Sequence, residues 1–164
     1  MKFGTLVRIC DINETEKKFL ELKELGFEAC QLVYKPKEYF EGDAKIIRES
    51  ADKIGIDISA QFCGYYDNDT IWDIYYGYLT AGLNVEAYRA SRLDYVRKAS
   101  RFASWVGITD VVIHAGFIPN NPFSAEYMTM LAAIKMLAQH CESMGLNLLF
   151  ETGGEAPITL LRLI

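Results

Sequence analysis

Four segments of the chain share one pattern of glycine, polar and apolar residues. They read ELGFEACQLVY, KIGIDISAQF, WVGITDVVIH and SMGLNLLFE, and in each a glycine is followed by an apolar residue, one or two polar residues and an apolar run. Glycine just past a helix is the usual left-handed cap, and a short apolar run is typical of a buried parallel strand. Each segment therefore predicts a helix end, a short loop and a strand.

Apolar residues recur at three- and four-residue steps in the stretches before these glycines, which predicts amphipathic helices. Asn13 and Ser124 each stand just ahead of an acidic first turn, so both are suitable N-cap residues. Proline suits the first turn of a helix, so Pro157 indicates the start of a last one. The expected helices cover about 14–25, 43–54, 86–106 and 126–144, with a fifth from Pro157.

Strands and helices alternate along the whole chain. The expected strands lie near 3–9, 28–34, 57–63, 109–115 and 147–151. Such alternation predicts an α/β protein with a parallel sheet, helices on its faces and right-handed crossovers. We expect residues 1–164 to form a single domain.

Two architectures fit this order. The first is an open, five-stranded doubly wound sheet, which the length of 164 residues favours. The second is the first five units of a TIM (β/α)8 barrel, a fold of about 250 residues. The loop CDINETE after the first strand is acidic and would repel the phosphate that a flavodoxin-type sheet binds there. The chain also ends TLLRLI, in the middle of an apolar helix, as a truncated barrel would.

Polar residues recur at the carboxyl ends of the expected strands. Arg8, Gln61, His114 and Glu151 lie at or near the ends of strands one, three, four and five. In a barrel these ends converge on one mouth, where catalytic groups gather, whereas in an open sheet they spread along a line. The preferred prediction is therefore a single partial (β/α) barrel, with the open doubly wound sheet as the alternative.

Composition excludes several classes of function. The net charge is −5 and no basic run occurs, so we expect no nucleic-acid partner. No apolar run approaches the roughly 20 residues that span a bilayer, so we expect no membrane partner. The four cysteines stand far apart without zinc-site spacing, which predicts reduced thiols in a cytoplasmic protein.

The segments VVIHAGFIP and ETGGE, together with the repeated glycine joints, resemble the xylose-isomerase-like TIM-barrel superfamily, above all its sugar phosphate isomerase/epimerase branch. The resemblance covers all 164 residues. It implies about three further βα units with additional metal ligands, which this chain lacks. It also implies a divalent metal (Mn²⁺, Mg²⁺, Co²⁺ or Zn²⁺) and metal-dependent proton transfer next to the carbonyl of a sugar or sugar phosphate.

The same resemblance assigns roles to individual residues. Glu151 matches the strand-five glutamate, a metal ligand and acid/base, although it could instead cap the next helix. His114 would contact the substrate or bind metal, as in the endonuclease IV group; otherwise neighbouring polar groups satisfy it. Gln61 could bind a sugar hydroxyl or merely fill the barrel, and it stands near the position where the endonuclease group carries a histidine.

A long insertion at 64–84 follows the third strand and holds half of the ten tyrosines together with Trp72. Loops on that face are often lids, and aromatic rings pack well on sugars, so Trp72 is a candidate substrate contact. It could equally pack the loop onto the domain. Arg89, with Arg92, falls in the first turns of helix three and could bind a phosphate or carboxylate. Pairing with the local acids, Glu86 or Asp94, is the alternative.

Three other functions stay open. The chain could be a non-catalytic partial barrel that assembles with another chain and binds a ligand, an endonuclease IV-like abasic-site nuclease, or a flavin-binding open sheet. Acidic charge and the missing strand-three histidine disfavour the nuclease. Five strands of an open barrel leave two unpaired edges, so we expect a homo-oligomer.

Overall fold

The computed structural model describes residues 1–35, 39–64, 82–151 and 155–164. Five parallel strands form one sheet in the order β1-β2-β3-β4-β5. Their bounds are β1 Gly4–Val7, β2 Ala29–Val33, β3 Asp57–Cys63, β4 Asp110–His114 and β5 Asn147–Glu151.

Helices follow the strands as the glycine pattern predicts. A short 3-10 helix, η1, covers Ile12–Glu14. The α-helices are α1 Thr15–Glu24, α2 Glu41–Ile54, α3 Glu86–Val106, α4 Ala125–Ser143 and α5 Pro157–Leu161. None of the helices in the described ranges is both long and apolar enough to cross a membrane.

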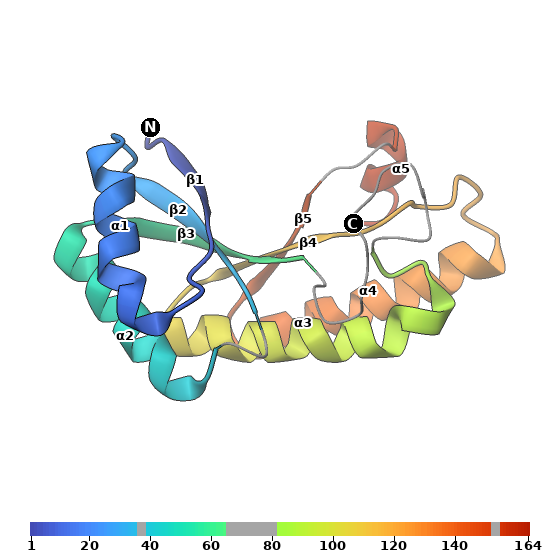
Figure 1. Cartoon of the computed structure of the whole chain (residues 1–164). Coiled ribbons are helices and arrows are strands. Elements are labelled where there is room, and N and C mark those ends of the chain that lie inside the picture. The colour runs from blue at the N-terminus through green and yellow to red at the C-terminus, as the bar shows by residue number, and fades with distance from the viewer. Residues whose placement is uncertain (36–38, 65–81, 152–154) are drawn as a thin grey trace.

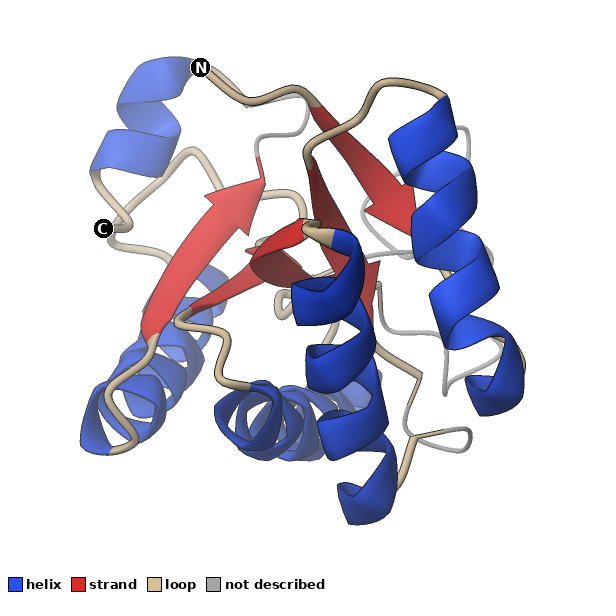
Figure 2. Ribbon diagram, turned by 90° about the vertical axis from the view of Figure 1, so that its left-hand side faces the viewer, coloured by secondary structure: helices blue, strands red, loops and turns tan. Residues whose placement is uncertain are grey.

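The sequential strand order separates a barrel from an open sheet. A doubly wound sheet reverses its strand order and divides its helices between two faces. Here α1 packs against α2, α2 against α3 and α3 against α4. Figure 1 shows these four helices along one face of the sheet, and the turned view in Figure 2 shows them as an arc around the strands. The fold is therefore the partial (β/α) barrel, and the open sheet is not formed.

Left-handed glycines end the helices where expected. Gly55 (φ 75°) follows α2 and Gly107 (φ 80°) follows α3. At the start of α4 the Ser124 side chain accepts a hydrogen bond from the Tyr127 N–H at 3.2 Å, which confirms the predicted N-cap. These caps satisfy backbone groups that the helix itself leaves unpaired.

The predicted N-cap at Asn13 is wrong. The Asp11 side chain accepts from the Asn13 N–H at 2.9 Å and caps η1. Helix α1 then begins at Thr15 without a side-chain cap. The local bond between Asp11 and the backbone two residues on inserts a tight turn before the helix, which a simple search for polar N-caps does not reveal.

The sheet has a helix-covered outer face and an inner face. The main core lies between the helices and the outer face, whereas Val33, Ala60, Phe62 and Val112 form a small separate cluster that marks the inner face. By register, Leu6 on β1 and Leu149 on β5 share this inner face, and they are 53% and 42% exposed. The inner face is thus buried at its centre and open at both edge strands.

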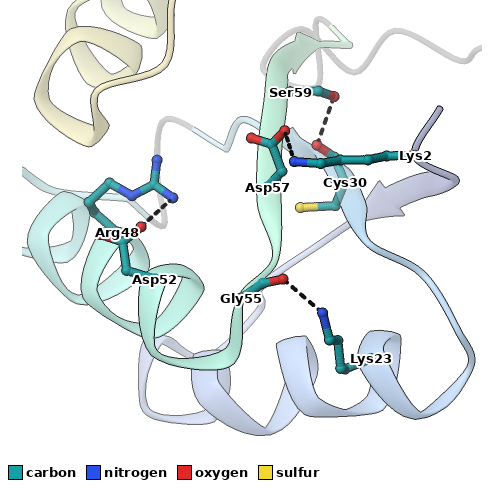
Figure 3. Close-up of polar contacts among 8 residues, drawn as sticks. All are labelled: Lys2, Lys23, Cys30, Arg48, Asp52, Gly55, Asp57 and Ser59. Atoms are coloured by element: carbon teal, nitrogen blue, oxygen red, sulfur yellow. Dashed lines mark hydrogen bonds and ion pairs between the residues drawn. The ribbon is translucent and has the colours of Figure 1, made fainter.

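Polar contacts tie the amino-terminal ends of the strands (Figure 3). Lys2 Nζ lies 3.0 Å from Asp57 Oδ2, and the Ser59 hydroxyl donates to the Cys30 carbonyl at 3.1 Å. These residues line a hollow of about 470 Å³. The ion pair is exposed, so it contributes at most about 1 kcal/mol. In barrels this end contributes stability, and the chemistry takes place at the opposite end.

Candidate functional site

His114 and Glu151 are the last residues of β4 and β5, and their Cα atoms are register partners. They follow Val112 and Leu149 by two residues, so the alternation of side chains places both on the inner face. Neighbouring strands are about 4.8 Å apart, which brings the two side chains within reach of one small ligand. His114 is half-buried and Glu151 is exposed.

A backbone hydrogen bond orients the His114 imidazole. Its Nδ1 accepts from the Gly116 N–H at 3.0 Å. A neutral imidazole that accepts at Nδ1 carries its proton on Nε2, so Nε2 is a donor. Coordination of a metal through Nε2 would require the proton to move to Nδ1, which would break the bond to Gly116. Of the two roles expected for His114, the geometry favours contact with a substrate oxygen.

Glu151 offers an exposed carboxylate at the same mouth. Helix α5 has Ala156 as its N-cap and no side-chain cap, so Glu151 does not cap it. Carboxylate and imidazole suit divalent cations in type. Two ligands are too few for a metal site, however, and the described part of the chain contains no group of three His, Cys, Asp or Glu that could hold a metal. These residues alone do not fit a complete metal site, and metal binding at Glu151 stays a prediction.

Gln61 faces away from the mouth. Its side chain is fully buried, and its Nε2 donates to the Ala99 carbonyl of α3 at 2.6 Å. The residue therefore links β3 to the helix layer on the outer face. This position argues against the predicted contact with a sugar hydroxyl, which needs a side chain on the inner face.

Arg89 binds backbone rather than an acid. Its Nε donates to the Leu83 carbonyl at 2.7 Å and its Nη2 to the Asn84 carbonyl at 3.1 Å. The suggested acid Asp94 pairs instead with Lys98 at 2.6 Å. A substrate contact at Arg89 would have to use its remaining N–H groups, and it stays a prediction.

Trp72 and most of the insertion lie outside the described residues. The carboxyl end of that insertion, 82–84, is described and lies against residues 115–116, beside His114. Sequence patterns did not single out this contact, although the glycines at 82 and 116 are the signal that could have found it.

The cysteines do not contribute to the mouth. All four are free thiols, and only Cys10 is exposed. Burial, and secondarily the Asp57 carboxylate, raises the pKa of Cys30 to about 12. Burial also raises the pKa values of Cys63 and Cys141. The three buried thiols are therefore protonated and unreactive near neutral pH.

A sequential parallel sheet, an outer helix layer and polar residues at the carboxyl ends of its strands define a (β/α)-barrel protein with a mouth at that end. Residues 19–160 match the family model of the xylose isomerase-like TIM barrel. The chain therefore belongs to the xylose isomerase-like TIM barrel family. No curated protein matches it.

Solved structures share the fold. A xylose isomerase domain protein from Planctomyces limnophilus has a TM-score of 0.85 and 26% identity, with 99% of this chain and 58% of that chain covered. A D-allulose 3-epimerase from Methylomonas sp. has a TM-score of 0.63 and 12% identity, with 99% and 58% covered. A 3-keto-D-glucoside 4-epimerase from E. coli has a TM-score of 0.62 and 17% identity, with 90% and 54% covered. This chain thus spans less than two thirds of these neighbours.

Proposed function

We propose that the protein isomerises or epimerises a sugar or sugar phosphate by moving a proton next to a carbonyl. The observation that carries the proposal is the register pairing of His114 with Glu151 on the inner face, at the carboxyl end of the sheet. A carboxylate and an imidazole donor side by side are what such a proton transfer requires. Structural similarity to two sugar epimerases supports sugar as the substrate class.

The two side chains have complementary roles in this proposal. Glu151, exposed at the strand end, takes the proton from the carbon beside the carbonyl. Its return to the neighbouring carbon gives isomerisation, whereas epimerisation requires a second acid, from outside the described residues, that delivers a proton to the other face. The Nε2–H of His114 donates to the oxygen on which negative charge develops. A divalent metal with Glu151 as one ligand would stabilise the same charge, with its remaining ligands supplied from outside the described residues.

Deuterium exchange tests this function without knowledge of the product. The protein is incubated with D-allulose or its 6-phosphate in D₂O, with and without Mn²⁺, and deuterium next to the carbonyl is measured by mass spectrometry. We expect incorporation that Glu151→Gln reduces by at least about 100-fold, as loss of a general base does. Glu126→Gln, on the exposed first turn of α4, is the matched control and should retain full exchange. No exchange from either sugar would contradict the proposal.

A non-catalytic binding module is the second candidate. It is favoured by the absence of a three-ligand metal cluster among the described residues. Calorimetric titration with the same sugars discriminates the two, because a binding module shows saturable heat without deuterium exchange.

An abasic-site nuclease is less well supported. The net charge of −5 opposes binding to a phosphate backbone. The end of β3 also carries Gln61, buried against α3, where a histidine ligand would be needed. A nicking assay on abasic duplex DNA is expected to show no cleavage.

A further inference from the structure

Residues 82–84 pack against the backbone that follows β4. Gly82 forms an antiparallel bridge with Gly116, and the Leu83 N–H donates to the Ala115 carbonyl at 3.0 Å. A Cβ atom added at Gly82 would lie 2.2 Å from both the Ala115 oxygen and the Gly116 Cα. Only glycine permits so close an approach, so the two backbone segments are held in one fixed arrangement.

Arg92 holds this segment from the helix side. Its Nη1 donates to the Gly82 carbonyl at 2.6 Å, and its side chain is fully buried. Its guanidinium also lies 5.2 Å from the centre of the Tyr88 ring. Burial of an arginine is costly, and five fixed donors make it suited to anchoring backbone in one geometry.

The contacts continue from this arginine to the candidate site. Arg92 binds Gly82, Gly82 pairs with Gly116, and the Gly116 N–H donates to His114 Nδ1 at 3.0 Å. Each step is a direct backbone or side-chain contact. Three contacts, through two intervening glycines, thus link the arginine to the imidazole.

We propose that Arg92 is a positioning residue for His114. By fixing Gly82 against Gly116, it keeps the Gly116 N–H aimed at Nδ1 and the imidazole proton on Nε2. The use of that Nε2–H on a sugar oxygen rests on the proposed function, whereas the control of the tautomer does not. Arg92 acts through the backbone and does not contact the ligand.

Imidazole nitrogen resonances report the tautomer directly. The chain has two histidines, so His140 on α4 serves as an internal control. Proton–nitrogen correlation spectra of ¹⁵N-labelled protein are recorded under mildly alkaline conditions, where free imidazole is neutral. In the wild type we expect well-separated His114 nitrogens with the proton on Nε2, and a scalar coupling between the Gly116 amide and Nδ1.

Substitution then distinguishes positioning from general anchoring. Arg92→Met should move the two His114 nitrogen resonances toward each other and leave His140 unchanged, while Arg92→Lys, which retains a donor, should restore much of their separation. Arg89→Met is the matched control, because Arg89 binds the Leu83 and Asn84 carbonyls rather than Gly82. It should alter the His114 signals far less.

Three results would overturn the proposal. They are an unchanged His114 tautomer in folded Arg92→Met, an equal effect of Arg89→Met, or no coupling between Gly116 and Nδ1 in the wild type. The last measurement needs no variant, so it holds even if Arg92→Met fails to fold. Deuterium exchange is scored separately: exchange can be absent while the tautomer responds as expected, which would refute the function and not the positioning.

Discussion

His114 and Glu151 lie directly opposite each other at the ends of two neighbouring parallel strands. One brings an imidazole whose Nδ1 is already bound by backbone, and the other an exposed carboxylate. Because they share a face and a register position, a ligand that reaches one side chain also reaches the other. The carboxyl ends of the strands are therefore where this molecule combines a proton acceptor with a hydrogen-bond donor.

Alanine substitution should affect stability differently at two glycines of α2, one that ends the helix and one near its start. Gly55→Ala should destabilise the protein by about 1 kcal/mol, because its φ of 75° strains any side chain. Gly42→Ala, near the start of α2 with nothing within 4 Å of an added Cβ, should be neutral or stabilise by up to about 1 kcal/mol. Urea denaturation of both variants measures the difference. Equal effects would contradict the cap assignment.

The outward position of Gln61 predicts intolerance of charge. Gln61→Glu should destabilise by about 3–5 kcal/mol, because it buries an unpaired carboxylate. Gln61→Leu should change the free energy of unfolding by no more than about 1 kcal/mol. It removes one hydrogen bond to Ala99, but it also removes a buried acceptor, Oε1, that has no partner. If Gln61 instead faced the mouth, Gln61→Glu would fold normally and change sugar binding.

Only one of the four cysteines should react rapidly with a thiol reagent in the folded protein. Cys10 is exposed, whereas burial raises the pKa values of Cys30, Cys63 and Cys141. An aromatic disulfide reagent near pH 7.5 should therefore modify one thiol per chain rapidly and the other three only on unfolding. Cys10→Ser should abolish the rapid phase, and a second rapid thiol in that variant would show that the core is more open than described.

The open edges of the sheet predict self-association. β1 and β5 end the strand order, and Leu149 on β5 is 42% exposed on the inner face. We expect sedimentation at micromolar concentration to show oligomers, because an exposed apolar edge strand recruits further chains. Leu149→Lys should shift the distribution toward monomer, whereas Leu20→Lys, equally exposed at 42% but on α1, should not. A dilute wild-type monomer with a cooperative melt would refute this expectation.

Much of the fold could be predicted because glycine joints and apolar runs are local signals. The predicted bounds of β3 and α3 match those observed. Gly55 ends the helix before β3 and Gly107 ends α3 itself, and a left-handed glycine does so wherever the chain goes afterwards. The mouth pair was predictable for the same reason. A residue that ends a parallel strand lies at the carboxyl edge of the sheet whatever its neighbours are.

The orientation of Gln61 was not predictable, because it depends on a bulge. Strict alternation from Ile58, which faces the helices, would turn Gln61 inward. The register of β2 and β3 shifts so that Cys30 pairs with Ile58 and Gln31 with Ala60. The extra residue reverses the faces, placing Ala60 inward and Gln61 outward.

The contacts of Arg89 and Arg92 were hidden for a different reason. Both arginines bind carbonyl oxygens of residues 82–84. Every residue carries a carbonyl, so no sequence pattern marks the partner. Only the close approach of Gly82 to Gly116 shows why that backbone needs an anchor.

The most direct test of the mouth pair is paramagnetic broadening of the histidine resonances by Mn²⁺, an ion that favours carboxylate ligands. The effect falls steeply with distance and is visible even at low occupancy, so an incomplete metal site suffices. We predict that His114 broadens at the lowest Mn²⁺ concentrations while His140 stays sharp, and that Glu151→Gln abolishes the difference. Equal broadening of the two histidines, or selective broadening of His114 that survives in Glu151→Gln, would contradict a shared site at the ends of β4 and β5.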